Sequence, residues 1–240
     1  MVKSAIILAG GKGERLRPYT DNLPKPMVPV LGRPILEYQV LWLKHLGVKH
    51  IVFCCGYKYE AIKEYFGDGS KWDMEFDYAV ENTPLGRGGA FKNALQFIPE
   101  SEEIIIGANG DEITGEDLTP MIENHIRNKA AATLLLMKLV SPFGIVDLED
   151  DGHVSGFREK PELPHWINTG IYIFNRSTIE MFPEVGDHED TTFPKLVEEE
   201  KMFGYKAQNY RTTINTVKEL NDATKELPNR LPKYLLSDKI

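Results

Sequence analysis

The chain has 240 residues, a formal net charge of −8 and 42% hydrophobic residues. This length suits one large domain with a buried core. The negative charge argues against a broad nucleic-acid or anionic-membrane footprint, so an anionic ligand would have to be held by local positive groups. No apolar run approaches ~20 residues and no signal-like leader stands at the start. We therefore expect a cytoplasmic protein with no membrane and no nucleic-acid partner.

Strands and helices alternate through the first half of the chain. Continuous apolar runs predict strands buried on both faces, and apolar residues at helical spacing predict helices between them. Such alternation is typical of a parallel, doubly wound sheet, in which the strand-to-helix loops lie along one edge. The predicted strands are residues 4–9, 50–55, 74–80 and 102–108, and the predicted helices are residues 34–46, 58–67 and 85–98.

The pattern changes after a predicted helix at residues 118–129. Short strands separated by turn residues follow, and no Gly/Ser/Pro-rich linker marks a boundary. We therefore expect these strands to continue the same sheet as a mixed layer. They are residues 131–140, 144–149, 153–161 and 167–174. After about Ala223 the sequence indicates the end of a helix and a tail without recognisable chemistry.

The only two cysteines, Cys54 and Cys55, are neighbours in an apolar strand. Adjacent cysteines rarely bridge, and an apolar setting suits small buried side chains. We expect buried, reduced thiols with no metal or catalytic role.

The loop after the first predicted strand, "GGKGER", is rich in glycine. Gly10, Gly11 and Gly13 leave backbone N–H groups unshielded, so phosphate oxygens could approach the main chain. Arg15 and Lys25 add positive charge, and prolines on both sides of Lys25 fix its backbone. The same residues are also consistent with a tight turn whose cations are solvated and bind no ligand. The loop is not a Walker motif, because no Gly-Lys-Ser/Thr follows, and it is not a dinucleotide motif, because no helix begins after the last glycine.

The stretch "LAGGKGERLRPYTDNLPKPMVPV" resembles the signature of the sugar-nucleotide pyrophosphorylases, nucleotidyltransferases that join an NTP to a sugar 1-phosphate. Further matches are "ENTPLGRGGA", "NGDE", "FGIV", "FREKP" and "INTGIYIF". The overall likeness is greatest to short bacterial guanylyltransferases that act on heptose or mannose 1-phosphate. The resemblance implies an α/β fold, a Rossmann-like three-layer α/β/α domain with a mostly parallel mixed sheet. Residues 1–240 would then form one domain, with a nucleotide half at about 1–115, a sugar-phosphate half at about 116–225 and a tail at 226–240.

The resemblance also assigns roles to individual residues. Arg15 would neutralise the departing pyrophosphate, Lys25 would steady phosphate charge near the reacting phosphorus, and Asp111 would bind Mg²⁺. The expected nucleotide-binding residues are Leu8, Ala9, Gly10, Gly11, Gly13, Glu81, Pro84 and Gly86. The expected sugar-phosphate-binding residues are Gly144, Glu159, Lys160, Asn168 and Thr169. The partners would be an NTP and a sugar 1-phosphate, and a homo-oligomer remains open.

Two positions depart from the family pattern. In relatives an aspartate near the C-terminus completes the metal site. The two positions of this chain that can be aligned with that aspartate are Thr213 and Asn215. Asn215 could be a neutral Mg²⁺ ligand, so we expect weaker metal binding or reduced activity. Arg87 replaces a threonine, and we leave open whether it contacts the nucleotide or solvent.

Glu81 stands where thymidylyl relatives carry glutamine. A carboxylate only accepts hydrogen bonds, and guanine offers adjacent N1–H and N2–H₂ donors. This favours GTP with a mannose- or heptose-like sugar 1-phosphate. The alternatives are a thymidylyl-, uridylyl- or cytidylyltransferase acting on glucose 1-phosphate, and a regulatory homologue that binds nucleotide-sugar without turnover.

Overall fold

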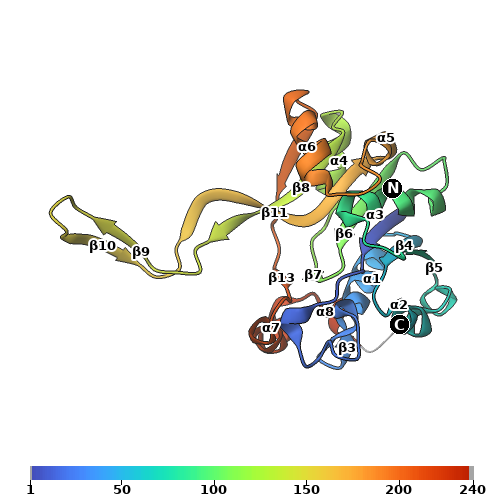
Figure 1. The fold of residues 1–240 in the computed structure, drawn as a ribbon, viewed down its shortest axis with the longest axis horizontal. Helices are drawn as coiled ribbons and strands as arrows, with labels where there is room; N and C mark the ends of the chain where they lie inside the picture. Colours follow the sequence, from blue (N-terminus) through green and yellow to red (C-terminus); the bar gives the residue numbers. More distant parts are fainter. Residues whose placement is uncertain (1, 238–240) are drawn as a thin grey trace.

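A seven-stranded sheet forms the centre of the computed structural model, which describes residues 2–237 (Figure 1). The strand order is β12-β8-β11-β6-β1-β4-β5. Neighbours β6, β1, β4 and β5 run parallel, whereas β11 runs antiparallel to both β6 and β8. The bounds are β1 Ser4–Leu8, β4 His50–Cys55, β5 Glu75–Val80, β6 Ile104–Asn109, β8 Ala132–Val140, β11 Glu162–Asn175 and β12 Met202–Lys206.

Helices cover both faces of the sheet, so the predicted three-layer α/β/α fold is confirmed. Successive residues of β1 point to opposite faces, and Ile6 and Ile7 accordingly belong to two separate buried clusters. One face packs against α1 Ile35–His45, α2 Tyr59–Phe66, α4 Thr119–Arg127, α7 Val217–Arg230 and α8 Lys233–Leu236. The other packs against α3 Gly86–Ala94, α5 Arg176–Glu180 and α6 His188–Glu198.

Short elements complete the chain at the ends of the main strands. The two-stranded pairs are β2 Pro29–Val30 with β3 Arg33–Pro34, β7 Glu112–Thr114 with β13 Arg211–Thr213, and β9 Ile145–Leu148 with β10 Val154–Arg158. The 3₁₀ turns are η1 Glu14–Leu16, η2 Lys25–Met27, η3 Ser70–Trp72 and η4 Leu95–Phe97. The pairing of β7 with β13 brings the segment after β6 beside the segment before α7, which matters for the site below.

The prediction that all four later strands continue the main sheet is wrong for two of them. Strands β8 and β11 do continue it, but β9 and β10 pair only with each other in a hairpin that projects far from the body (Figure 1). The reason lies in β8 and β11, which stay paired out to Val140 and Glu162 and so carry the hairpin outward.

The predicted tail is part of the folded body as far as residue 237. Leu227, Leu231 and Leu235 are buried in the main core, and the Tyr234 ring stacks on His45 at 3.8 Å between centroids. Residues 238–240 lie outside the described residues.

Both cysteines are buried and unpaired, as predicted. Burial raises the pKa of each thiol, so both stay protonated and unreactive. No helix within residues 2–237 has the length and apolarity needed to cross a membrane.

His188, the first residue of α6, is fully buried among aromatic rings. Its ring stacks on Phe182 and meets Phe193 edge-on, both at 4.7 Å between centroids. Burial lowers the pKa of His188 to about 3. Below about pH 6.5 the imidazole of His188 is therefore protonated in the unfolded chain but stays neutral in the folded chain.

We expect the free energy of unfolding to fall as pH drops from 6.5 towards 4, with this histidine contributing about 1.4 kcal/mol per pH unit. His188→Phe, which keeps the ring and removes the titration, should flatten that slope in urea melts at pH 4 to 7. His153→Gln, which changes an exposed histidine, serves as the control. An unchanged slope in His188→Phe would contradict this account.

Candidate active site

A cavity of about 480 Å³ opens at the carboxyl ends of β1, β4, β5 and β6. This is the edge of a parallel sheet at which α/β proteins bind ligands, and the volume suits a nucleotide-sized molecule. The glycine-rich loop and the segments "ENTPLGRGGA" and "NGDE" all contribute to it. Its lining residues are Leu8, Gly10, Gly11, Lys25, Pro26, Cys54, Glu81, Pro84, Gly86, Arg87, Ala90, Asn109, Gly110, Asp111 and Asp187.

The glycine-rich loop presents free backbone donors at the cavity. In the described chain, the amides of Gly10, Gly11 and Gly13 have no hydrogen-bond acceptor. Gly13 adopts a φ of +66°, and a Cβ there would lie 2.7 Å from the Cβ of Lys25, so only glycine lets the loop fold against that lysine. Ala9, by contrast, donates its amide to the Cys54 carbonyl within the sheet and does not line the cavity.

Lys25 is the centre of a four-residue polar cluster beside this loop. Its ammonium donates to the Asp111 carboxylate and, at 2.7 Å, to Asn215 Oδ1. Arg15 donates to the same Asn215 oxygen at 3.3 Å. The Lys25 side chain is only 12% exposed, so the ion pair is poorly screened by water. The structure thus brings together Arg15, Lys25, Asp111 and Asn215, which lie up to 200 positions apart in the chain.

Asn215 rather than Thr213 occupies the C-terminal position of the cluster. The Ile214 amide donates to the Asp111 carbonyl at 3.2 Å, and the Asn215 amide donates to Glu219 Oε2 at 2.8 Å. These bonds hold the start of α7 against Asp111. Thr213 points the other way and donates to Glu112 Oε1 at 2.7 Å.

The donor set of the cluster fits Mg²⁺ with few protein ligands. Asp111 and Asn215 offer one carboxylate and one amide oxygen, and Mg²⁺ usually keeps waters and phosphate oxygens in its remaining positions. The other carboxylates nearby are engaged elsewhere, since Glu219 accepts the Asn215 amide and Glu112 is buried with Arg211. Within residues 2–237 no group of three or more His, Cys, Asp or Glu side chains could hold a metal alone.

Glu81 lies at the opposite side of the cavity, at the end of β5. Its Oε2 accepts the Leu85 amide at 3.1 Å, and its Oε1 faces Gly10, where a Cβ would come within 3.2 Å. Gly86 has a φ of +75° and packs against the Gly186 backbone, which a Cβ would approach to 2.7 Å. Glu81, Pro84 and Gly86 line the cavity together.

Arg87 faces the cavity but is bound to protein carboxylates, which neither sequence interpretation foresaw. Its guanidinium forms ion pairs at 2.9 Å with Asp187 and with Glu189. Its backbone amide also donates to Asp187 at 2.8 Å. Hydrogen bonding from Arg87 lowers the pKa of the Asp187 carboxyl. Arg87 therefore fastens the start of α6 to the start of α3.

The five expected sugar-phosphate residues fall into two groups. Asn168 and Thr169 do not line the cavity, but they precede Gly170, whose Cα lies so close to the lining residue Asn109 that a Cβ would clash with its side chain. The Thr169 hydroxyl is buried and donates to the Leu135 carbonyl at 2.9 Å. Gly144, Glu159 and Lys160 lie at the root of the projecting β9–β10 hairpin and do not line the cavity.

The sequence did not reveal the polar support behind Asp111. Arg211 forms an ion pair with buried Glu112 and donates to the Thr169 carbonyl at 3.1 Å. Burial raises the pKa of Glu112 to about 7, although Arg211 opposes this. Gln39 of α1 donates to the Asn109 and Glu112 carbonyls and so fixes the turn that carries Asp111. Glu112 was visible in "NGDE", but nothing local marks Arg211 as its partner 99 positions away.

Comparison with known proteins agrees with this geometry. The sequence matches the nucleotidyl transferase family over residues 4–227. It is 36% identical to a D-glycero-α-D-manno-heptose 1-phosphate guanylyltransferase of Aneurinibacillus thermoaerophilus, covering 93% of this chain and 97% of that one. It is 34% identical to a mannose-1-phosphate guanylyltransferase of Mycobacterium tuberculosis and to a UTP–glucose-1-phosphate uridylyltransferase of Synechocystis, of which it spans only 61% and 55%.

The fold also matches solved structures. Superposition on HddC from Yersinia pseudotuberculosis gives a TM-score of 0.73 at 29% identity, covering 94% of this chain and 99% of that one. The match of the sequence over nearly its whole length and the shared fold lead to one conclusion: the chain belongs to the nucleotidyl transferase family.

Proposed function

We propose that this protein condenses an NTP with a sugar 1-phosphate to give a nucleoside-diphosphate sugar and pyrophosphate, with GTP and a mannose- or heptose-like sugar as substrates. The observation that carries the proposal is the cluster of Lys25, Asp111, Asn215 and Arg15 beside the free amides of the glycine-rich loop. The family membership and the two guanylyltransferase relatives support it.

In the proposed reaction, an oxygen of the sugar phosphate attacks the α-phosphorus of the NTP. A new P–O bond forms, the bond between the α-phosphorus and the bridging oxygen breaks, and pyrophosphate leaves with that oxygen. The attacking phosphate already carries its charge, so no base has to remove a proton. The protein has to hold two anions in line and stabilise the charge of the transition state.

The glycine-rich loop and the polar cluster around Lys25 have different tasks in this reaction. The amides of Gly10, Gly11 and Gly13 bind triphosphate oxygens, and Arg15 neutralises the pyrophosphate as it departs. Lys25 is held by Asp111 and Asn215 at the cavity wall. Its charge would there meet the phosphate charge near the reacting phosphorus. Asp111 and Asn215 would hold Mg²⁺, which supplies further neutralisation of phosphate charge when bound.

Glu81 is the proposed reader of the base. Its Oε1 is free of hydrogen-bond donors in the described part of the chain, whereas its Oε2 already accepts the Leu85 amide. The carboxylate can accept guanine N1–H and N2–H₂, while the carbonyls of uracil or thymine would repel it. Asn168 and Thr169 are the proposed sugar contacts beside Asn109.

The rival function is a nucleotide-sugar sensor that binds without turnover, and the neutral Asn215 in place of an aspartate is what favours it. A matrix of five NTPs against several sugar 1-phosphates, with product masses read out, separates the two. Nucleotide binding without any pyrophosphate release would support the sensor and defeat the enzyme.

Removing the central cation should abolish most of the rate. Lys25→Met should lower kcat/KM about 10²- to 10³-fold, because the transition-state charge loses a preorganised partner. Lys12→Met, an exposed lysine of the same loop, should change it less than about threefold, as a solvated charge contributes little. Pyrophosphate release measures both, and equal effects of the two substitutions would contradict the role of Lys25.

Base selection should depend on the charge of residue 81. Glu81→Gln places an amide donor against the guanine donors, so the preference for GTP over UTP should fall about 10- to 100-fold. Glu75→Gln, on the exposed face of the same strand, is the control. A clear preference of the wild type for UTP or dTTP would defeat the GTP assignment.

The metal requirement should follow the charge at residue 215. Asn215→Asp adds a second carboxylate beside Asp111 and should lower the half-saturating Mg²⁺ concentration about tenfold. Calorimetric Mg²⁺ titration of the nucleotide complex reads this out without turnover, and Asn209→Asp adds the same charge at an exposed site as a control. Saturation of the wild type at micromolar Mg²⁺ would overturn the expectation.

A further inference from the structure

The hairpin β9–β10 and the ribbon that carries it form a long projection, which we call the arm (residues 138–166; Figure 1). Within the described chain, no hydrogen bond, ion pair or ring contact joins residues 142–160 to the main sheet or to any helix. A two-stranded hairpin standing alone is marginally stable in water. The arm therefore needs a surface to cover it.

One face of the hairpin is apolar and uncovered. Val146 pairs with Phe157 and Leu148 pairs with Val154, so these four side chains share a face. The opposite face carries the ion pair of Asp147 with Arg158. Such a division between an apolar and a polar face is typical of a sheet that packs on one side.

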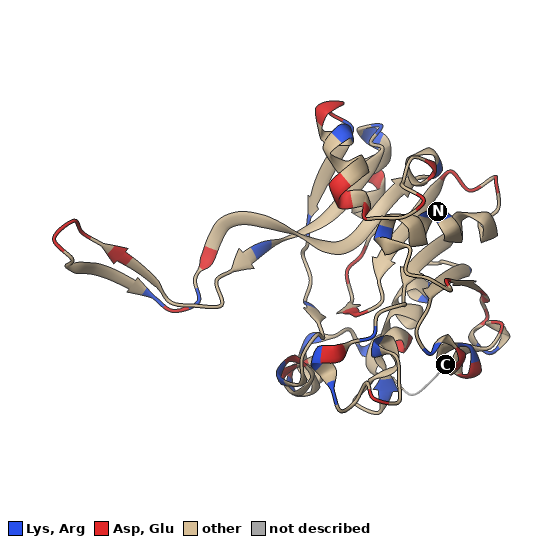
Figure 2. Ribbon diagram, viewed as in Figure 1, with Lys and Arg blue, Asp and Glu red and all other residues tan. Residues whose placement is uncertain are grey.

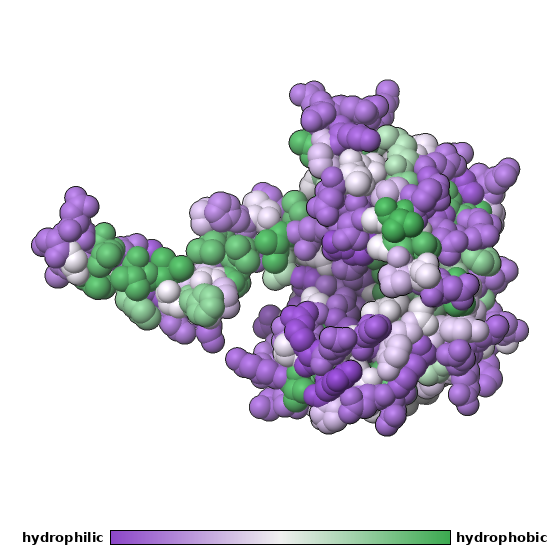
Figure 3. Space-filling model, viewed as in Figure 1, coloured by the Kyte–Doolittle hydropathy of each residue, from purple (hydrophilic) through white to green (hydrophobic). Residues whose placement is uncertain are grey.

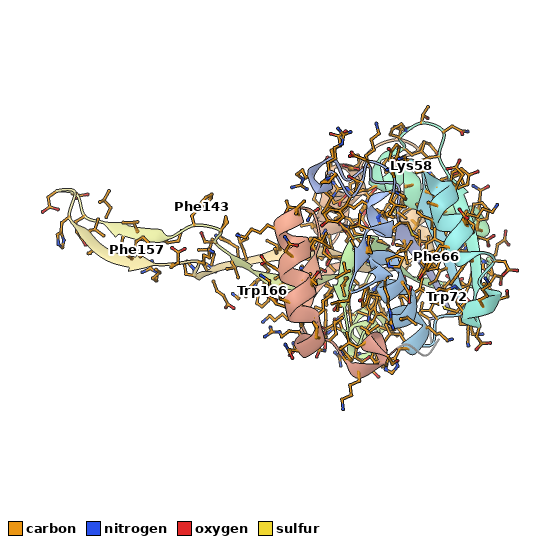
Figure 4. The ribbon with its side chains drawn as sticks, turned by 90° about the horizontal axis from the view of Figure 1, so that it is seen from below. Lys58, Phe66, Trp72, Phe143, Phe157 and Trp166 are labelled. Atoms are coloured by element: carbon orange, nitrogen blue, oxygen red, sulfur yellow. The ribbon has the colours of Figure 1, made fainter. Side chains whose placement is uncertain are left out.

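The apolar surface continues along the arm as far as its root, as the band of hydrophobic residues in Figure 3 shows. Phe143 is 73% exposed and Phe157 is 64% exposed, and Figure 4 shows both of them along the projection and away from the body, with Trp166 at its root. The exposed apolar residues are Val140, Phe143, Val146, Leu148, Val154, Phe157 and Trp166. Exposed apolar residues concentrated in this way, rather than scattered singly over a surface, mark an interaction site.

The cavity described above is short of positive charge in the same chain. Its lining carries the cations Lys25 and Arg87 against the carboxylates of Glu81, Asp111 and Asp187. Both cations already pair with carboxylates. Arg15, beside the cavity, is assigned above to the departing pyrophosphate, so the sugar phosphate still lacks a cation of its own. Lys160, at the root of the arm, has no ion-pair partner among residues 2–237 and stands next to Glu159.

Lys160 does not line the cavity of its own chain, and the ribbon that carries it is tied to the main sheet. Strands β8 and β11 stay paired through Lys138–Trp166 and Val140–Glu162, and the Ser141 amide donates to the Pro161 carbonyl at 3.0 Å. The ammonium groups of Lys138 and Lys206 lie over the Trp166 ring, 4.4 and 4.9 Å from its centre. These contacts hold the arm outward.

The charge of the tip restricts what the arm can meet. Glu149, Asp150 and Asp151 form an acidic turn at its outer end, visible in Figure 2. An anionic lipid surface or a nucleic acid would be repelled by it. A second copy of this chain offers a cavity that lacks the same cation, and it carries an identical uncovered arm. If each copy places its arm on the other, the exchange is symmetric and gives a closed dimer.

We propose that two copies of this chain exchange arms, so that Glu159 and Lys160 of each copy complete the sugar-phosphate side of the other copy's cavity. The role of Lys160 in this proposal rests on the proposed function. The association of two chains through their arms does not depend on that function. The apolar face of the arm packs on the second copy, and the acidic tip passes beyond the cavity into solvent.

The first experiment measures mass by light scattering and sedimentation at micromolar concentrations. Wild type should be a dimer, and Phe143→Ser/Phe157→Ser should shift it to monomer with an unchanged Tm for the body. Ile126→Ser/Val197→Ser, which changes two exposed apolar residues of the body, should stay dimeric. A monomeric wild type that makes nucleotide-sugar would overturn the proposal.

The second experiment decides which chain supplies Lys160. Chains carrying two different affinity tags are co-expressed and mixed dimers are purified through both tags. With Asp111→Asn on one chain and Lys160→Ala on the other, the exchange gives one intact site per dimer and roughly half of the wild-type activity, whereas either single variant alone is nearly inactive. With both changes on one chain and a wild-type partner, the exchange predicts almost no activity.

An arm that serves its own chain predicts the reverse result for the two mixed dimers, and that outcome would overturn the proposal. If wild type made no product with any substrate pair, the proposed function would fail. The mass measurements would then still confirm or refute arm exchange by themselves.

Discussion

The ion pair of Lys25 with Asp111, shared with Asn215, is the contact on which the rest of the site depends. It joins the end of β1, the end of β6 and the start of α7, three segments that the sheet edge and the short β7–β13 pair bring together. The Asp111 carboxylate compensates the charge of the poorly exposed Lys25 ammonium, so no buried charge is left unpaired. In the proposed reaction the same ammonium would meet an incoming phosphate.

Much of the surrounding structure serves to hold this contact in place. Gln39 fixes the turn before Glu112, and the buried pair of Glu112 with Arg211 supports the same turn from behind. Arg87 and Asp187 close the other side of the cavity by joining α3 to α6. Within residues 2–237 the amides of Gly10, Gly11 and Gly13 have no internal acceptor, whereas the carbonyls of Gly11 and Gly13 accept hydrogen bonds from the amides of Lys25 and Leu16.

The arm separates some of the candidate site residues from the body of the protein. The body holds the cavity, which is the proposed nucleotide site, whereas Gly144, Glu159 and Lys160 lie on the projecting ribbon. Exchange of arms would make a complete site a property of two chains. Activity would then depend on protein concentration, since a separated chain would lack one of the cations needed to bring two phosphates together.

Apolar periodicity predicted the elements of the nucleotide half and a doubly wound sheet, and the glycine-rich loop pointed to Arg15 and Lys25, because these are local signals. The three-layer α/β/α class, Asp111 and the alternatives Thr213 and Asn215 came from the resemblance to a known family. The sequence also placed the two cysteines in the core. Only the tertiary structure chose Asn215 over Thr213, engaged Arg87 with Asp187 and Glu189, and paired Glu112 with Arg211, since these contacts join distant segments. It alone separated β9 and β10 from the sheet. Alternation of apolar and polar residues in a strand predicts that one face is apolar, but not which surface covers that face. The position of the β9–β10 hairpin, outside the main sheet, follows from the length over which β8 and β11 remain paired.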